Sequence, residues 1–363
     1  MGGNRGGTIG WAALALASLA ALSCGTTGGG AERLTEADIV YTKKPALVGA
    51  LWGKEWYGDA LLPGVRDEGA RIASEGGFRI DLAEAGVDPY DAAALSARFE
   101  EWSAEGRDRF LALSWILQDS IERAAPRLPD SRFALVLGSG RAANTIGTDW
   151  RYEEAGFVAG WAAARAARAR GFGAVGYLGG SEDATEVALE AGFTAGARAA
   201  EPGIAVLAAY HPTGSGDATQ NAIVAEYLFA RGAGIIACVS WEMGEGALAA
   251  AAARAASGDR RSVIGLWTEL REAATDGPAA EAALFSVLFD EGALAREALE
   301  ALVAEHFEGG RTLAVGAVEG AFLLSEGNPP EGEALVAELE AVLARIAAGE
   351  FELPDFPEER YLR

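Results

Sequence analysis

Short apolar runs alternate with alanine-rich helical segments from about Pro45 to the end of the chain. The runs predict strands at Ala46–Leu51, Phe78–Ile80, Phe110–Ser114, Phe133–Leu137, Gly173–Leu178, Ile204–Ala208, Gly234–Val239, Ser262–Leu266 and Thr312–Ala317. The segments between them predict helices at Ala60–Ser74, Tyr90–Glu105, Tyr152–Arg170, Glu182–Ala200, Asp217–Arg231, Gly244–Ser257 and Glu331–Ala348. Continuous apolar strands are typical of parallel sheets covered on both faces. The strict alternation therefore predicts an α/β fold with right-handed crossovers.

Two such series follow one another, which predicts two doubly wound lobes around a cleft. Residues 45–148 with about 267–318 are expected in the N-terminal lobe, and residues 149–266 with about 319–350 in the C-terminal lobe. Residues 351–363 are expected to form a C-terminal tail. Hinges are then expected near Gly147–Trp150, Leu266–Glu269 and Gly316–Gly320.

The first 23 residues predict a signal peptide. Trp11–Ser23 is an uncharged apolar run, too short for a spanning helix of about 20 residues. Ala21-Leu22-Ser23 before Cys24 resembles a bacterial lipobox, with Ala21 where leucine is common. We expect a lipid on Cys24, a flexible tether over residues 24–44, and a location in the cell envelope facing the periplasm or exterior. Ordinary cleavage at the same residues is the alternative.

The net charge of the chain argues against one class of partner. The chain has 30 Lys and Arg against 53 Asp and Glu, a net charge of −23. Nucleic acid is therefore not an expected partner, because phosphate contacts require clustered basic residues. The two cysteines are Cys24 and Cys238, and we expect the second to be a buried free thiol. The protein is expected to be a monomer.

Aromatic residues at strand ends are the most informative feature of the sequence. Ligands of open α/β sheets bind beyond the carboxyl ends of the strands, and aromatic faces suit a planar heterocycle, a sugar ring or a quaternary ammonium. Trp102 and Trp161 lie within helix patterns and are expected in the core. The predicted ligand-binding residues are Trp52, Trp56, Tyr57, Trp115, Asp149, Trp150, Trp241, Glu242, Trp267 and Glu269.

Enzyme classes find little support in the sequence. Gly138-Ser-Gly140-Arg-Ala-Ala143 follows a strand like a dinucleotide-binding motif, but a β-like segment follows it where the mechanism needs a helix. His211 and His306 are the 2 histidines, far apart and outside any metal-ligand spacing, and His211 is expected in an exposed turn. We expect no catalysis, no cofactor and no metal.

Several motifs in order resemble the basic membrane protein family, which includes purine-nucleoside-binding lipoproteins of ABC importers. Glu154-Ala-Gly-Phe-Val-Ala-Gly160 is similar to the family's EGSFLAG run, and Val175-Gly-Tyr-Leu-Gly-Gly180 with Glu190-Ala-Gly-Phe-Thr-Ala-Gly196 to its VGFIGG and GFxAG pair. Further similar runs are Gly232–Ile236 with Gly244–Gly246, and Pro126–Phe133. The resemblance implies a type I periplasmic-binding-protein fold with three crossings, and an ABC permease as partner.

The ligand residues of the family carry over only in part. Tyr57-Gly58 aligns with its aromatic-Asn pair, and Ile264–Leu270 with its IGVDxDQ segment. The family's ribose-binding Asp then falls on Trp267, the second Asp on Glu269, and its Lys near Phe289. A purine nucleoside or nucleobase is the expected ligand, and these replacements favour the flatter, less hydroxylated base. A ligand sensor for a signalling partner and a sugar-binding protein of the same fold are the alternatives.

Overall fold

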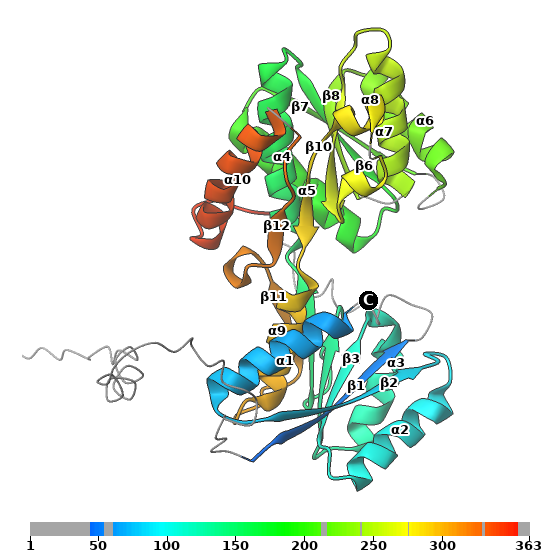
Figure 1. Cartoon of the computed structure of the whole chain (residues 1–363), viewed down its shortest axis with the longest axis vertical. Coiled ribbons are helices and arrows are strands. Elements are labelled where there is room, and N and C mark those ends of the chain that lie inside the picture. The colour runs from blue at the N-terminus through cyan, green and yellow to red at the C-terminus, as the bar shows by residue number, and fades with distance from the viewer. Residues whose placement is uncertain are drawn as a thin grey trace, which may run out of the picture. The chain divides into compact units, whose positions relative to one another are not determined.

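The computed structural model describes residues 44–53, 61–211, 216–239, 242–274, 276–328 and 331–354. Sheet A belongs to the first lobe and has the strand order β11-β5-β4-β3-β1-β2 (Figure 1). All its neighbouring strands are parallel. The bounds are β1 Ala46–Gly53, β2 Ile80–Val87, β3 Arg109–Leu113, β4 Arg132–Val136, β5 Thr145–Trp150 and β11 Arg311–Val315.

Sheet B belongs to the second lobe and has the order β12-β10-β9-β8-β6-β7. Its neighbours are parallel except for the short edge strand β12, which is antiparallel to β10. The bounds are β6 Ala174–Gly179, β7 Ala205–Tyr210, β8 Ala233–Val239, β9 Ser262–Trp267, β10 Ala283–Phe289 and β12 Phe322–Leu324.

Helices cover both faces of sheet A. α1 (Leu62–Gly76) packs beside α9 (Glu291–Val303) over one face, and α2 (Ala92–Ala104) packs with α3 (Gln118–Ala124) over the other. The short turns η3 (Trp115–Leu117) and η4 (Ala125–Arg127) flank α3. The α2 face contains Trp102, which is 3% exposed and stacks on Phe110 at 6.4 Å between ring centroids, so its predicted place in the core is confirmed.

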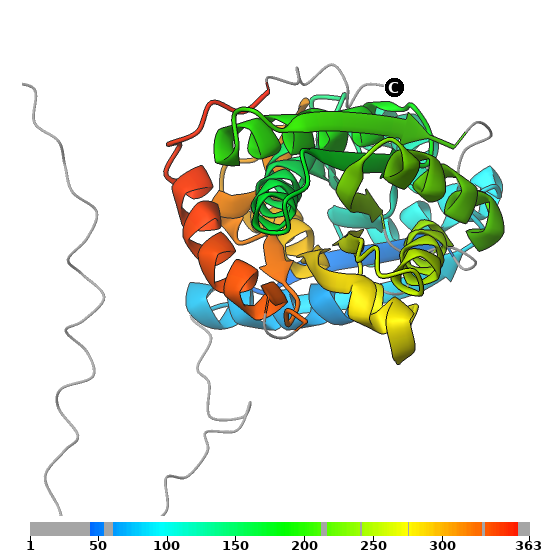
Figure 2. The same cartoon turned by 90° about the horizontal axis from the view of Figure 1, so that it is seen from above.

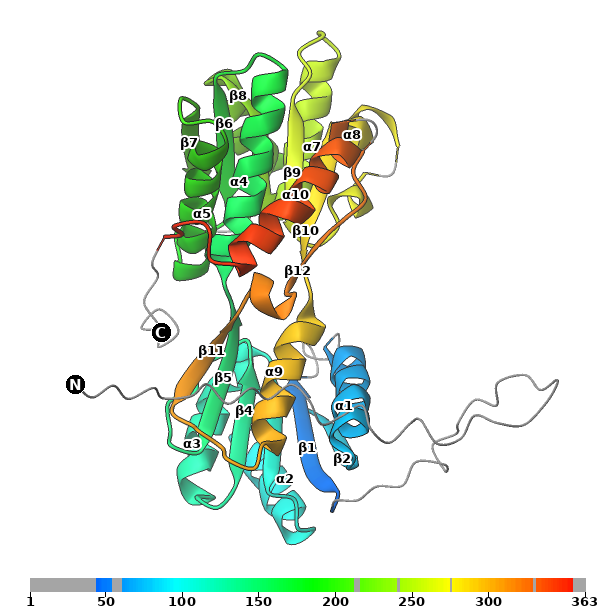
Figure 3. The ribbon, with the colours of Figure 1, turned by 90° about the vertical axis from the view of Figure 1, so that its left-hand side faces the viewer.

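In the second lobe, α4 (Tyr152–Ala169) lies between α5 (Ala184–Ala200) and α10 (Glu331–Ala347) (Figure 3). α6 (Ala218–Ala230) and α7 (Glu242–Ala255) pack together over the other side of sheet B, as the view from above shows (Figure 2). The remaining elements are η5 (Leu270–Glu272), α8 (Gly277–Ala282) and η6 (Ala317–Glu319). Two parallel-dominated, doubly wound lobes confirm the predicted fold class.

The chain crosses between the lobes three times. The first crossing follows β5 at Trp150, and the third runs from the end of β11 to the start of β12. The second was predicted near Leu266–Glu269, and this boundary is wrong. Residues 283–289 form β10 in sheet B and pair with β9, so the chain crosses only between Phe289 and Glu291. The second crossing lies later in the chain than predicted because the apolar strand β10 belongs to sheet B and α9 begins directly after it.

α4 and α5 pack with their backbones in contact. Both helices carry glycine at positions four residues apart, and each glycine faces the partner's backbone: Gly156, Gly160, Gly192 and Gly196. A β-carbon at Gly160 would lie 2.0 Å from the carbonyl oxygen of Phe193, and one at Gly196 would lie 2.0 Å from that of Phe157. The repeated Glu-Ala-Gly-Phe-x-Ala-Gly motif therefore serves helix packing, which explains its two copies.

We expect Gly160→Ala to destabilise the protein by about 1–3 kcal/mol, because its methyl group forces apart two close-packed helix backbones. The free energy of unfolding in urea, followed by circular dichroism, measures the effect. Gly203→Ala is the matched control, since no heavy atom lies within 4 Å of a β-carbon there. Equal stability of the two variants would contradict the close packing.

Candidate functional site

The register of sheet A brings several strand ends into one row. Trp52 pairs with Leu113, Leu113 with Val136, and Val136 with Thr148, so β1, β3, β4 and β5 end at the same edge. Neighbouring strands lie about 4.8 Å apart. The residues that follow these ends therefore share an edge that a small molecule can span.

Trp115 is the most accessible of the predicted aromatic residues in the described part of the chain. It is the first residue of η3, directly after β3, and 59% of it is exposed. Trp52, at the end of β1, is half-buried and packs against the core beneath α1 and α9. The strand-end edge of sheet A thus carries an exposed indole on η3 and a half-buried one on β1, and apolar faces of this kind are typical of small-molecule sites.

Backbone strain is concentrated at the same kind of edge. Among the described residues, three that are not glycine have positive φ: Ser114 at 103°, Leu137 at 58° and Trp267 at 83°. Ser114 follows β3, Leu137 follows β4, and Trp267 ends β9. Such conformations cost on the order of 1–3 kcal/mol each and are retained most often at functional sites. Strain therefore marks the carboxyl edges of both sheets, at Ser114 and Leu137 in sheet A and at Trp267 itself in sheet B.

The loop after β4 explains the motif that resembled a dinucleotide-binding turn. The side-chain amide of Gln118 clamps Ser139, accepting from its nitrogen at 2.8 Å and donating to its oxygen at 2.9 Å. A β-carbon at Gly140 would lie 2.2 Å from the carbonyl oxygen of Arg311. Because Gly140 has no side chain, the loop can pass close to β5 and β11. No helix begins at this turn.

The predicted pair Asp149 and Trp150 divides into two roles. Asp149 is half-buried, and its Oδ1 accepts hydrogen bonds from the nitrogen of Trp150 at 2.8 Å and the hydroxyl of Tyr152 at 2.9 Å. Trp150 has no exposed surface, and its ring meets Phe289 edge-on at 5.4 Å. Trp150 therefore packs in the interior at the first crossing, while Asp149 lies half-buried at the strand-end edge.

The predicted residues of the second lobe are held by neighbouring groups. Trp267 stacks almost parallel on Phe289, with ring centroids 4.9 Å apart. Oε1 of Glu269 accepts from the nitrogen of Arg271 at 3.0 Å and from Oγ of Ser286 at 3.3 Å. Glu242 is exposed in the first turn of α7. The predicted residues Cys24, Trp56, Tyr57 and Trp241 lie outside the described residues.

Two tyrosine–carboxylate pairs at the ends of β6 and β7 were not predicted. The Tyr177 hydroxyl donates to Oε2 of Glu186, and the Tyr210 hydroxyl donates to Oε2 of Glu190 at 2.5 Å. Oε1 of Glu186 also accepts from the nitrogen of Gly180 at 3.3 Å, in the loop after β6. Each pair joins a strand residue to a residue of α5, so it forms only when the helix packs against the sheet.

Burial raises the pKa of Glu186 to about 7, although hydrogen bonds from Tyr177 and Gly180 favour its ionised form. Burial is also the main reason why the pKa values of Tyr177 and Cys238 are raised. His211, expected in an exposed turn, is buried with 7% exposure directly after β7. This end of sheet B thus holds titratable groups that are shielded from solvent.

Among the described residues, no group of three or more His, Cys, Asp and Glu is arranged to hold a metal ion. No helix in the same part of the chain combines the length and apolar character needed to cross a membrane.

The chain is similar to known proteins in sequence and in fold. A sequence model of the Bmp family, described as ABC transporter substrate-binding protein PnrA-like, matches residues 67–356. Among solved structures, a solute-binding protein of an ABC transporter system from Aeropyrum pernix K1 has a TM-score of 0.56 at 18% identity, covering 87% of this chain and 95% of that one. A similar solute-binding protein from Conexibacter woesei has 0.58 at 21%, covering 85% and 98%.

A third solved structure has a different description. The transcriptional activator of the comK gene from Bacillus halodurans has a TM-score of 0.60 at 15% identity, covering 85% of this chain and 100% of that one. At these identities the likeness to solved structures concerns the fold, which all three share with this chain over most of their length.

We expect the ionisation of Glu186 to lower stability as pH rises. Its folded-state pKa of about 7 lies above the usual glutamate pKa of 4.5, so its contribution to stability is complete below about pH 4.5 and is lost as pH rises through 7. Glu186→Gln should reduce the change in the unfolding free energy between pH 5 and pH 8 by up to about 3 kcal/mol. Glu190→Gln is the control, and an identical pH profile in the Glu186 variant and the wild type would contradict the assignment.

Proposed function

Because the chain belongs to the PnrA-like family of ABC transporter substrate-binding proteins, we propose that it binds a small ligand with an aromatic face and delivers it to an ABC permease. Proteins of this family are extracytoplasmic transport components without catalytic activity. The observation that carries the proposal is Trp115, which is 59% exposed at the end of β3 beside the strained Ser114.

Binding is proposed to work by closure of the lobes. A ligand that contacts the strand ends of both sheets favours the arrangement in which both sets of contacts form. The three crossings leave the lobes connected by short segments, which suits a hinge. The permease would then recognise the ligand-bound arrangement.

A nucleobase is favoured over a nucleoside as the ligand. The resemblance assigns the ribose carboxylate to the position of Trp267, whose ring stacks on Phe289. The carboxylate of Glu269 is engaged by Arg271 and Ser286. A site with an indole in place of a carboxylate gains stacking area and loses an acceptor for sugar hydroxyls.

The membrane attachment is proposed to be a lipid on Cys24, with residues 24–44 as the tether. The lipobox-like sequence before Cys24 supports this attachment. Palmitate labelling of the wild type and of Cys24→Ser, with mass spectrometry of the mature N-terminus, separates lipid attachment from ordinary cleavage.

A sensing role is the second candidate function. The comK activator from Bacillus halodurans, described as a transcriptional activator, shares the fold over 85% of this chain. Neighbouring permease and ATPase genes would favour import, whereas a neighbouring sensor kinase or chemoreceptor gene would favour sensing. A sugar ligand in the same fold is the remaining alternative for specificity.

We expect adenine or guanine to bind with micromolar affinity and ribose or glucose not to bind, because the proposed site offers aromatic faces in place of the ribose carboxylate. Calorimetric titration of bases, nucleosides and sugars measures this, and native mass spectrometry of the freshly purified protein identifies a retained ligand. Binding that requires the ribose would contradict the preference for a base and leave the transport role intact.

Trp115→Ala should weaken that binding by about 1–3 kcal/mol, because it removes the exposed stacking surface. Tyr227→Ala is the matched control, since Tyr227 is 52% exposed but lies on α6 beside Arg231. Unchanged affinity in Trp115→Ala, with a normal unfolding curve, would remove Trp115 from the proposed site.

A further inference from the structure

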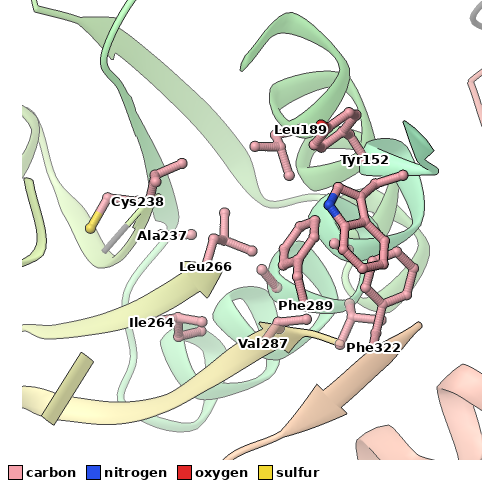
Figure 4. Close-up of a cluster of buried hydrophobic side chains, with 14 of the residues drawn as sticks. Tyr152, Leu189, Ala237, Cys238, Ile264, Leu266, Val287, Phe289 and Phe322 are labelled. Carbon is pink, nitrogen blue, oxygen red and sulfur yellow. The ribbon is translucent and has the colours of Figure 1, made fainter. Parts of the chain in front are cut away.

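Five aromatic rings meet where the chain crosses between the lobes. Phe289, at the end of β10, lies at the centre of the cluster (Figure 4). Its ring centroid is 4.9 Å from that of Trp267, 5.2 Å from Phe322, 5.4 Å from Trp150 and 6.1 Å from Tyr152. Every crossing supplies at least one ring, so this hinge cluster is built from segments distant in the sequence.

The rings divide unequally between the lobes. Trp267, Phe289 and Phe322 end or begin strands of sheet B, and Tyr152 is the first residue of α4. Trp150 ends β5 of sheet A, where it pairs with Val315 of β11. The indole of Trp150 is therefore the ring that the first lobe contributes to a cluster otherwise formed by the second.

The contact geometry makes Trp150 sensitive to rotation of the lobes. Its ring stands at 85° to Phe289 at 5.4 Å, and at 41° to Phe322 at 6.3 Å. Trp150 is fully buried, Phe322 is 5% exposed and Phe289 is 7% exposed. Edge-to-face pairs depend on ring separation and angle, and a buried ring cannot exchange a lost contact for water without cost. A change in the angle between β5 and β10 therefore changes these contacts directly.

The cluster is also connected to the candidate ligand edge. Oδ1 of Asp149 accepts from the nitrogen of Trp150 and from the hydroxyl of Tyr152, whose ring packs on Trp267 at 5.9 Å and on Phe289. Asp149 lies in sheet A and Tyr152 opens α4 in the second lobe, so the hydrogen bond from Tyr152 spans the first crossing. A force on the Asp149 carboxylate reaches the hinge cluster through two hydrogen bonds.

We propose that the packing of the Trp150 indole against Phe289 and Phe322 sets the equilibrium between two lobe arrangements by stabilising the one seen here. This inference rests on the closure mechanism of the proposed function. A contact made in one arrangement and lost in the other shifts the population by its own free energy. Trp150 thus acts as a positioning residue that tunes ligand affinity without contacting the ligand.

The test measures the distance between the lobes in ligand-free protein. Spin labels are placed at Glu100→Cys on α2 and Arg198→Cys on α5, both exposed, in a chain carrying Cys24→Ser. Cys238 is fully buried and does not label. Double electron–electron resonance then gives the distance distribution. Trp150→Phe and Phe322→Leu are the test variants, and Trp161→Phe on α4, outside the cluster, is the control.

In both test variants, the population at the distance of the present structure should fall about two- to tenfold relative to the other population. Trp161→Phe should reproduce the wild-type distribution. Two variants of different size at different crossings keep the test decisive if Trp150→Phe does not fold. An unchanged distribution in the folded variants, or a single population in every chain, would overturn the proposal.

A second arm separates the hinge proposal from the proposed function. Adenine at saturating concentration is added to the doubly labelled wild type and to each variant. Two results together support both the hinge proposal and the proposed function. Adenine changes the distance in the wild type, and the apparent affinity of each variant differs from that of the wild type by the same factor as its ligand-free population. If no compound of the base, nucleoside and sugar panel moves the wild-type distance, the closure function fails, while the ligand-free comparison still decides the role of Trp150.

Discussion

The contacts that the three crossings make with one another are the constraint on which the candidate site depends. Each crossing is held by backbone hydrogen bonds as well as by rings. The nitrogen of Arg151 donates to the carbonyl oxygen of Val315, and the nitrogen of Asp290 to that of Ala321, both at 2.9 Å. Oε2 of Glu154 accepts from the nitrogen of Ala317 at 2.6 Å, a bond that joins the first crossing to the third. These bonds tie the three crossings to one another, so a change in the angle between the lobes involves all three.

The alternation of apolar and helical segments was sufficient to predict the fold class, because parallel strands buried on both faces leave a clear hydrophobic signal. The signal weakened at the sheet edges. β2 was expected at Phe78–Ile80 but runs over Ile80–Val87, since an edge strand with one solvent-facing side includes Asp81 and Glu84. β10 and α9 were missed because the second crossing was placed before them. The topology of a late crossing depends on tertiary packing and has no local sequence signature.

The candidate site could be predicted by position but not by orientation. Parallel topology brings Trp52, Trp115 and Asp149 to one edge, as the strand-end argument required. It does not determine whether a side chain turns outward. Trp150 turns inward because the chain enters a crossing at that residue, and Trp267 adopts a φ of 83° that accompanies its stacking on Phe289. Glu186 and Tyr177 were missed for a related reason, since only the folded sheet brings a strand residue and a helix residue together.

The resemblance implies that an indole at position 267 stands where the family has a carboxylate, and this exchange would change which groups can supply specificity. A pocket that hydrogen-bonds a hydroxyl rejects analogues lacking it by large factors, whereas an apolar surface discriminates weakly between ligands of similar shape. Stacking can thus provide affinity for a planar ring but little directional selection. Glu269 and Asp149 each accept two hydrogen bonds from neighbouring groups, so in the proposed site part of the acceptor capacity of both carboxylates is already used. The donors to Asp149 are Trp150 and Tyr152 of the hinge cluster, so in this proposal the residues at the hinge also orient a polar group of the site.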